Sequence, residues 1–231
     1  MPNLQALIFD MDGVIIDNTL VQARAFQLLF RDQAVEADAQ QLLRRLNGAP
    51  ASEILKDAFG EAASEKELTA FADQREFLYR TLYWDERRAL PGLMEFLEAA
   101  RAAGLKIGLG TGSGQPSIAY ILDGLNLRRF FDVVISKDDV DKGKPHGDTY
   151  SVTAEKLGVD PAHCVVFEDA LLGEQSAYRA GMQCVAVAST LPGRDFQAPL
   201  LVIRDFTELT PARLREQFEQ APAVPQPKTA A

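Results

Sequence analysis

Short apolar runs separated by helical patterns constrain the fold of this chain more than any other feature. The runs cover residues 4–9, 106–109, 133–135, 164–167, 184–187 and 201–203. Runs this short and this apolar are typical of strands that are covered on both faces, as in a parallel sheet. Helical patterns lie between the later runs, at 94–103, 116–125, 149–157 and 173–180. Because strands that alternate with single helices form βαβ units, the sequence predicts an α/β fold with a doubly wound, Rossmann-like parallel sheet core.

The region between the first run and residue 88 does not follow this alternation. It reads as successive amphipathic helices, at 21–31, 39–46 and 65–82, with no strand pattern. Such a block is typical of an inserted α-helical cap domain. We therefore expect three parts: an α/β core formed by residues 1–17 and 89–210, a helical cap domain formed by residues 18–88, and a C-terminal tail, 211–231. The tail is expected to be mobile because proline and alanine dominate residues 221–227.

The net charge of the chain limits the kinds of molecule that it is expected to bind. The chain of 231 residues carries 33 acidic and 24 basic side chains, a net charge of −9. This balance argues against nucleic acid or an anionic membrane surface. The first residues lack the zones of a secretory signal, and Cys164 and Cys184 lie in apolar runs, as expected of buried thiols in a reducing compartment. We expect a cytoplasmic monomer that binds a small molecule.

Polar side chains gather where the predicted strands end. In an open parallel sheet, ligands bind beyond the carboxyl ends of the strands, so residues at these ends are expected to share one edge. The first run ends at an Asp-Met-Asp-Gly segment, and the second ends at a segment of glycine, threonine and serine. The residues expected at this edge are Asp10, Asp12, Thr111, Gly112, Ser113, Lys144, Glu168 and Asp169.

Four carboxylates at one edge require a cation or protons. Two unit charges about 4 Å apart repel by roughly 4 kcal/mol at the effective dielectric near a protein surface. Hard oxygen ligands without histidine or cysteine favour Mg²⁺. Magnesium keeps several waters and readily takes a phosphate oxygen as a ligand. The sequence therefore predicts a Mg²⁺ site and a small phosphorylated metabolite as substrate.

The spacing of Asp10 and Asp12 suits phosphoryl transfer. Residues two apart in extended backbone point to the same side, so both carboxylates can reach one substrate. One carboxylate can attack phosphorus while the other, held protonated by its neighbours, protonates the leaving oxygen. The phosphate oxygens are expected to be held by the start of the following helix and by four residues. These are Thr111, Gly112, Ser113 and Lys144.

In this order, the motifs resemble those of the haloacid dehalogenase superfamily. The segment Phe-Asp-Met-Asp-Gly-Val-Ile-Ile-Asp at 9–17 matches its first motif, and Thr111 stands at its second. Lys144-Pro145 stands at the third motif and Glu168-Asp169 at the fourth, so that the resemblance spans about 7–187. The segments 90–92 and 169–181 resemble the corresponding segments of one branch of this superfamily, which contains β-phosphoglucomutase and small sugar-phosphate phosphatases. That branch carries a helical cap after its first motif.

The resemblance assigns roles to individual residues. It implies that Asp10 is the nucleophile, forming an aspartyl-phosphate, and that Asp12 is the general acid and base. It also implies that Mg²⁺ is bound by the side chains of Asp10 and Asp169 and by the backbone carbonyl of Asp12. Glu168 is either a further ligand or a solvated turn residue. The resemblance thus implies a Mg²⁺-dependent phosphatase.

A β-phosphoglucomutase-type mutase is the alternative. The segment 46–53, with Asn47 and Gly48 as candidate substrate contacts, aligns with the substrate-selecting loop of these mutases. They place an arginine near Ala51 to hold the second phosphate, whereas no basic residue occurs here from 47 to 55. Arg75, on a cap helix, is a candidate replacement or a solvated surface residue. Since hydrolysis demands less of the cap, the sequence favours a phosphatase.

Further readings fit less well. Asp12 argues against dehalogenase and phosphonate-cleaving activities, because those members lack the second acid of the first motif. A dinucleotide site at 108–114 fails on glycine spacing. A non-catalytic binding or regulatory protein with this fold would have lost a motif residue, and Asp10, Asp12, Thr111, Lys144 and Asp169 are all present. His146 and His163 lack partners at ligand spacing and are interpreted as non-catalytic.

Overall fold

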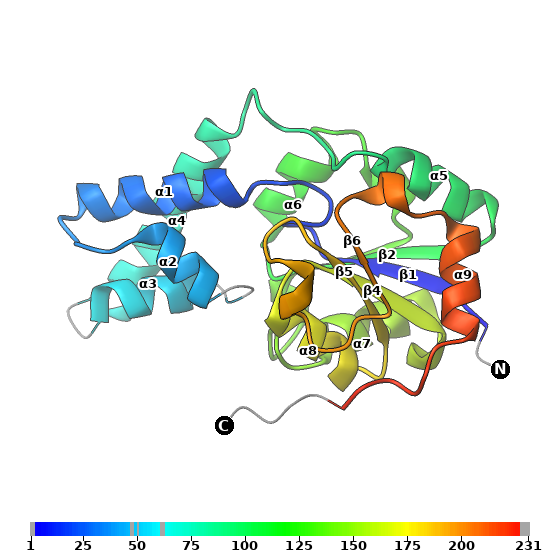
Figure 1. The fold of residues 1–231 in the computed structure, drawn as a ribbon. Helices are drawn as coiled ribbons and strands as arrows, with labels where there is room; N and C mark the ends of the chain where they lie inside the picture. Colours follow the sequence, from blue (N-terminus) through cyan, green and yellow to red (C-terminus); the bar gives the residue numbers. More distant parts are fainter. Residues whose placement is uncertain (1–2, 47–48, 50, 61–62, 227–231) are drawn as a thin grey trace. The chain divides into compact units, whose positions relative to one another are not determined.

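The computed structural model describes residues 3–46, 49, 51–60 and 63–226, and the chain divides into two compact units (Figure 1). Residues 1–17 and 88–231 form the first, here called the α/β unit. Residues 18–87 form the second, here called the helical unit.

A parallel sheet of six strands forms the centre of the α/β unit, within the residues that the structure describes. The strands are β1 (Ala6–Phe9), β2 (Lys106–Gly110), β3 (Val133–Ile135), β4 (Cys164–Glu168), β5 (Gln183–Val187) and β6 (Leu201–Ile203). Their order in the sheet is β3-β2-β1-β4-β5-β6, and each neighbouring pair is parallel. The predicted doubly wound parallel sheet is confirmed, because the order runs outward in both directions from β1.

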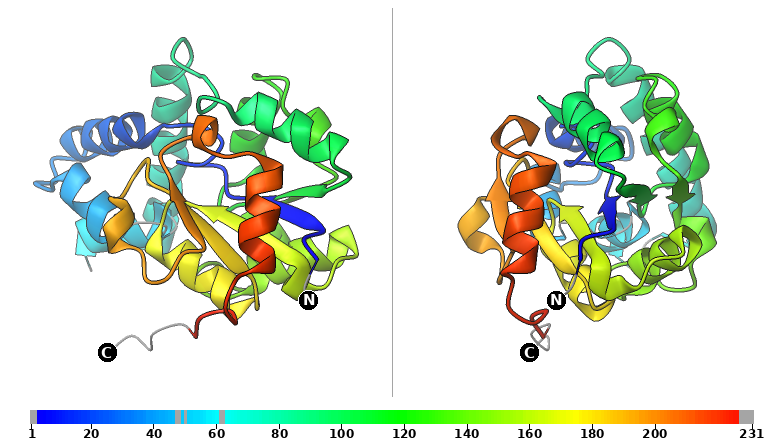
Figure 2. Two further views of the ribbon diagram at one scale, coloured as in Figure 1. Left: turned by 45° about the vertical axis from the view of Figure 1, so that its right-hand side comes forward. Right: turned by 90° about the vertical axis from the view of Figure 1, so that its right-hand side faces the viewer.

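Helices cover both faces of this sheet (Figure 2). Those of the α/β unit are α5 (Leu93–Ala102), α6 (Gln115–Leu122), α7 (Asp148–Leu157), α8 (Leu171–Arg179) and α9 (Pro211–Glu219). Helix α7 packs against β1, β2 and β3, and α8 packs against β4 and β5. On the opposite face α5 packs against β2 and against α9.

The two faces of β1 explain why its sequence is apolar throughout. Ala6 and Ile8 pack with Tyr150 of α7 in one core cluster. Phe9 points to the other face, where its ring stacks on that of Phe167 with centroids 4.6 Å apart. Successive side chains of a strand alternate between faces, so a strand covered on both sides needs apolar residues at every position.

The helical unit contains α1 (Thr19–Asp32), α2 (Ala39–Arg45), α3 (Ala51–Phe59) and α4 (Glu65–Leu82). The described part of this unit contains no strand. Asp38 caps α2, and Ser64 forms a capping box with Glu67 at the start of α4. Residues 51–53, expected in a loop, begin α3 instead. The buried core of this unit comprises Phe26, Leu29, Phe30, Ala39, Leu42, Ile54, Leu55 and Leu68.

The expected mobile tail is wrong over residues 211–219. These residues form α9, which is capped by the Thr210 hydroxyl and begins with Pro211 in its first turn. Leu214 and Phe218 are 0% and 2% exposed, so the helix contributes to the core. The alanine and proline residues farther on suggested a tail, whereas the apolar spacing of four within 214–218 is the helical signal.

Two further observations concern the cysteines and the character of the helices. Cys164 and Cys184 are free, buried thiols. Among the helices that the structure describes, none combines the length and apolar character required to cross a bilayer.

We predict that α9 is a structural part of the α/β unit. Leu214→Ala is expected to lower the free energy of unfolding by about 2–5 kcal/mol, because it removes a fully buried side chain and leaves a cavity. Glu216→Ala, an exposed position on the same helix, is the control and should change stability by less than about 0.5 kcal/mol. Urea denaturation of both variants measures the difference. Equal stabilities would show that α9 is dispensable.

Candidate active site

Three buried carboxylates meet at the carboxyl edge of the sheet. Asp10 follows β1, and Glu168 and Asp169 stand at the end of β4. Phe9 of β1 pairs with Phe167 of β4 in the parallel register. The acids that follow these two residues are therefore brought side by side. Asp10, Glu168 and Asp169 are 7%, 0% and 7% exposed. One carboxylate oxygen from each lies within 4.8 Å of the others, an arrangement that could hold a metal ion. The strand-end rule therefore located these acids correctly.

Lys144 places a positive charge among these acids. Its Nζ lies 2.8 Å from Asp10 Oδ1 and 2.5 Å from Glu168 Oε1, and its side chain is 6% exposed. Burial alone would lower the pKa of Lys144, but Asp10 and Glu168 outweigh this effect and raise that pKa. The ammonium therefore stays charged and offsets part of the negative charge of the cluster.

Glu168 is the most constrained of the acids. Its Oε1 accepts hydrogen bonds from Lys144 Nζ and the Tyr150 hydroxyl, and its Oε2 accepts from the backbone N–H groups of Asp169 and Ala170. Gly173 of α8 lies against it: a Cβ there would come within 1.8 Å of Oε1. Glu168 is thus a buried, fully engaged carboxylate and not a solvated turn residue.

Burial and like charges oppose ionisation of the other two acids in the metal-free protein. Burial is the largest influence on the pKa of Asp10 and, with Glu168 and Asp12, raises it to about 7 against the opposing effect of Lys144. Burial, followed by Glu168 and Asp10, also raises the pKa of Asp169 well above its usual range. A divalent cation would relieve this repulsion, so the donor set fits a hard metal ion.

Asp12 stands apart from the buried cluster. It is partly exposed, and its Oδ2 accepts a hydrogen bond of 2.8 Å from the Ser113 hydroxyl. The Ser113 N–H donates to Thr111 Oγ1 at 3.2 Å, and Thr111 itself is 1% exposed. A Cβ at Gly112 would meet no atom within 4 Å, so its backbone borders open space. These contacts bring the end of β2 next to the turn after β1.

Gly13 allows that turn to close against Asp169. Its φ is +75°, a conformation that favours glycine, and a Cβ would come 2.1 Å from Asp169 Oδ2. The chain can therefore turn away after Asp12 only because residue 13 has no side chain.

Comparison with known proteins identifies the family. The model of a family described as haloacid dehalogenase-like hydrolase matches residues 7–187, most of the chain. This chain belongs to the haloacid dehalogenase-like hydrolase family. The predicted resemblance is therefore confirmed, and the chain belongs to a family of enzymes.

Individual relatives of this hydrolase are similar over most of their length. Fructose-1-phosphate phosphatase YqaB of Escherichia coli is 33% identical over 181 residues, which cover 78% of this chain and 95% of the relative. A phosphorylated carbohydrates phosphatase of Thermotoga maritima is 29% identical and covers 78% of this chain and 83% of its own. The crystal structure of β-phosphoglucomutase from Clostridium difficile superposes with a TM-score of 0.84 at 25% identity, covering 94% and 98% of the two chains.

Arg75, Asn47 and Gly48 are predicted substrate contacts of this hydrolase. Arg75 belongs to the helical unit, where its Nη1 donates to Gln22 Oε1 at 2.9 Å and its guanidinium lies 5.3 Å from the centre of the Phe26 ring. Its side chain is 12% exposed, so it is not a solvated surface residue. Asn47 and Gly48 lie outside the described residues.

The sequence reasoning missed residues at this edge. Ser189 and Thr190 follow β5: the Ser189 hydroxyl donates to the Gly13 carbonyl at 2.5 Å, and Thr190 hydrogen-bonds to Asp169. The strand-end rule would have found both if it had been applied to β5. Tyr150 is different, because it lies within α7 and its sequence context marks it only as a core residue.

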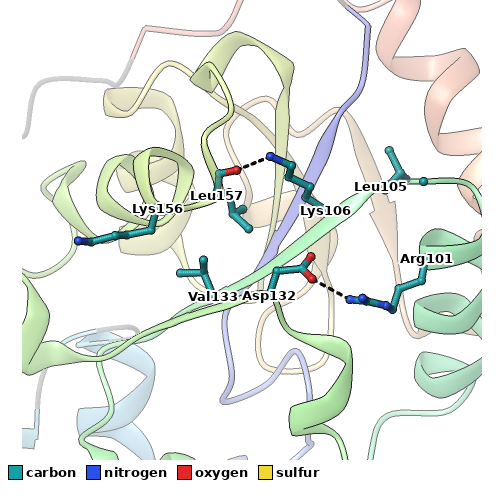
Figure 3. Close-up of a pocket in the computed structure, with 8 residues that line it drawn as sticks. Arg101, Leu105, Lys106, Asp132, Val133, Lys156 and Leu157 are labelled. Atoms are coloured by element: carbon teal, nitrogen blue, oxygen red, sulfur yellow. Dashed lines mark hydrogen bonds and ion pairs between the residues drawn. The ribbon is translucent and has the colours of Figure 1, made fainter.

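A hollow at the opposite edge of the sheet lacks this chemistry (Figure 3). It has a volume of about 470 Å³ and lies around the start of β2, where charged and apolar residues line it in equal number; Arg101, Lys106 and Asp132 are among the charged ones. These side chains are used locally: Arg101 pairs with Asp132 at 3.0 Å, and Lys106 donates to the Leu157 carbonyl at 2.6 Å. The carboxylate cluster is therefore the candidate active site.

We predict an unusual pH dependence of stability for the metal-free protein. Between about pH 4 and about pH 7 the folded state keeps a proton on Asp10 that the unfolded chain has released, so this residue makes stability fall as pH rises. A pKa shift from 3.8 to about 7 corresponds to at most about 4 kcal/mol.

Melting temperatures in EDTA at about pH 5 and about pH 7.5 test this expectation. Asp10→Asn should be stabilised relative to wild type at the higher pH more than at the lower. Asp123→Asn, an exposed position at the end of α6, is the control. The interpretation would be wrong if wild type and Asp10→Asn showed the same pH dependence.

Proposed function

We propose that this protein is a Mg²⁺-dependent phosphatase that hydrolyses a small phosphorylated metabolite, with a sugar phosphate as the favoured class. The observation that carries this proposal is the buried Asp10 carboxylate, which pairs with Lys144 at 2.8 Å and is followed two residues later by a second acid, Asp12. The names of the relatives in Escherichia coli and Thermotoga maritima support phosphorylated sugars as substrates.

In this proposal Asp10 is the nucleophile. An oxygen of its carboxylate attacks phosphorus, a bond forms between that oxygen and phosphorus, and the bond to the leaving ester oxygen breaks. Asp12 gives its proton to the leaving oxygen, and the products are an alcohol and an aspartyl-phosphate on Asp10. Asp12 then accepts a proton from water, which attacks phosphorus and releases phosphate, so that Asp10 is regenerated.

The surroundings of Asp12 suit this exchange of protons. Its side chain is partly exposed, unlike the buried Asp10, and therefore accessible to a leaving group or a water. The Ser113 hydroxyl donates to Oδ2 of Asp12 at 2.8 Å and so helps to fix the position of this carboxylate. A positioned acid of this kind contributes typically about 10²–10⁴-fold to rate.

Mg²⁺ is proposed to bind the side chains of Asp10 and Asp169 and the backbone carbonyl of Asp12. When bound, the ion neutralises charge on the transferring phosphoryl group and favours the ionised form of Asp10. Glu168 belongs to the same cluster, but both of its oxygens already accept hydrogen bonds. We propose that it adds negative charge to the site and fixes Lys144.

The remaining residues at the edge are proposed to hold the phosphoryl group. Lys144 offers positive charge, Thr111 a hydroxyl, and the backbone N–H groups near Gly112 and Ser113 lie at the open end of β2. Donors fixed in place before the reaction stabilise developing charge without reorganisation.

A mutase of the β-phosphoglucomutase type is the second candidate, favoured by the structural similarity to the Clostridium difficile enzyme. Arg75, and Asn47 with Gly48, are proposed cap contacts for substrate in either case. Transfer from the aspartyl-phosphate to a second hydroxyl, instead of water, distinguishes the two functions. The absence of a basic residue from 47 to 55 keeps hydrolysis as the favoured function.

Loss of the nucleophile is expected to abolish turnover without unfolding the protein. Asp10→Asn should lower the rate of p-nitrophenyl phosphate hydrolysis in Mg²⁺ by about 10⁴-fold or more, because the group that forms the bond to phosphorus is lost. EDTA should abolish wild-type activity, and added Mg²⁺ should restore it. Asp123→Asn is the matched control and should keep wild-type activity. An active Asp10→Asn variant would rule out Asp10 as the nucleophile.

A screen of phosphorylated metabolites is expected to show phosphate release from sugar phosphates in the presence of Mg²⁺. β-Glucose 1-phosphate with its bisphosphate is assayed in parallel for glucose 6-phosphate. Arg75→Ala should raise KM for the best substrate by roughly tenfold, the loss of one charge-assisted contact, whereas Arg24→Ala, exposed on α1, should not. Formation of glucose 6-phosphate without release of phosphate would establish the mutase instead.

A further inference from the structure

Tyr150 contacts the candidate active site from inside the core. It lies on α7 and is 0% exposed. Its hydroxyl donates to Glu168 Oε1 at 2.6 Å, and Lys144 Nζ lies 5.0 Å from the centre of its ring. Burial, followed by the charges of Glu168 and Asp10, raises the pKa of the phenol well above its usual range, so it remains a donor.

Lys144 depends on such contacts for its position. The chain from 141 to 147 forms no helix or strand, so no backbone ladder orients its side chain. Its ammonium is shared between Asp10 at 2.8 Å and Glu168 at 2.5 Å. An ammonium has three donors, and a group shared between two carboxylates in this way retains one for a phosphoryl oxygen.

Glu168 connects Lys144 to the rigid core through its hydrogen bonds. The backbone N–H groups of Asp169 and Ala170 fix Oε2. Tyr150 and Lys144 share Oε1, so the hydroxyl decides where on that oxygen the ammonium can bind. Tyr150 is itself rigid, because α7 packs against β1, β2 and β3 and a Cβ at Gly110 would come 3.3 Å from its ring.

We propose that Tyr150 is a positioning residue: its hydroxyl fixes Glu168, and its ring borders Lys144, so that the ammonium stays shared with the nucleophile Asp10. This inference rests on the proposed phosphatase function. Without the hydroxyl, Glu168 Oε1 has lost a competing donor and attracts the ammonium more strongly. Lys144 then moves away from Asp10 and from the phosphoryl group that Asp10 attacks.

The chain offers a matched control in Tyr178. This residue is also buried, at 4% exposed, and its hydroxyl donates to a carboxylate, Glu174 Oε1, at 2.8 Å. Tyr150→Phe and Tyr178→Phe therefore remove the same atom from the same kind of buried hydrogen bond. Both variants keep the aromatic ring, so each should lower the melting temperature by a few degrees. The two positions differ in that only Tyr150 is next to Lys144.

We expect Tyr150→Phe to lower kcat for p-nitrophenyl phosphate by about tenfold, the size expected for one hydrogen bond to a charged group. KM and the Mg²⁺ concentration for half-maximal activity should change less than about twofold, because the metal-binding groups are untouched. Tyr178→Phe should keep the wild-type kcat. Crystal structures of both variants should show Lys144 Nζ displaced from Asp10 in Tyr150→Phe alone.

Two outcomes would overturn the inference: a kcat of Tyr150→Phe within about twofold of wild type, or an equal loss of kcat in Tyr178→Phe. Failure of the proposed function is recognised separately, because wild type would then show no hydrolysis that depends on Asp10. In that case the position of Lys144 in the crystal structures decides the question, and an unmoved ammonium in Tyr150→Phe refutes the positioning role.

Discussion

The ammonium of Lys144, held between Asp10 and Glu168, is the interaction on which the site depends. Burying a carboxylate without a partner costs several kcal/mol, and this edge of the sheet buries three. One fixed positive charge reduces that cost but does not remove it, as the raised pKa of Asp10 and of Asp169 indicates. The remaining imbalance favours a cation. The metal binding that we propose would neutralise the negative charge that Lys144 leaves uncompensated in this cluster.

Glu168 links this charge balance to the fold. One of its oxygens is bound by the backbone at the turn into α8, and the other is bound by Lys144 and Tyr150. The same residue therefore ends β4, accepts hydrogen bonds from the turn that leads into α8, and holds a side chain from a distant loop. A shift of the turn after β4 would therefore move Glu168, and with it the ammonium of Lys144.

The fold and the cluster were predictable because they follow from short-range patterns. Apolar runs gave the strands, and parallel register brings the residues after Phe9 and Phe167 together without further information. Tyr150 was not predictable in the same way, because its role depends on side-chain contacts made by the folded chain. The expected tail failed at α9, where composition outweighed the apolar spacing of Leu214 and Phe218. Nothing local in the sequence reports the partners of Arg75.

Gly173 shows how the candidate active site limits the stability that helix α8 can reach. Glycine in a helix is less favourable than alanine by up to about 1 kcal/mol, so helix formation alone would select alanine at this position of α8. A methyl group there would occupy the space of the Glu168 carboxylate, at 1.8 Å from Oε1. The helix therefore retains a residue that weakens it. Engineering for thermal stability by the usual replacement of helical glycines would damage this enzyme at the position where the rule promises a gain.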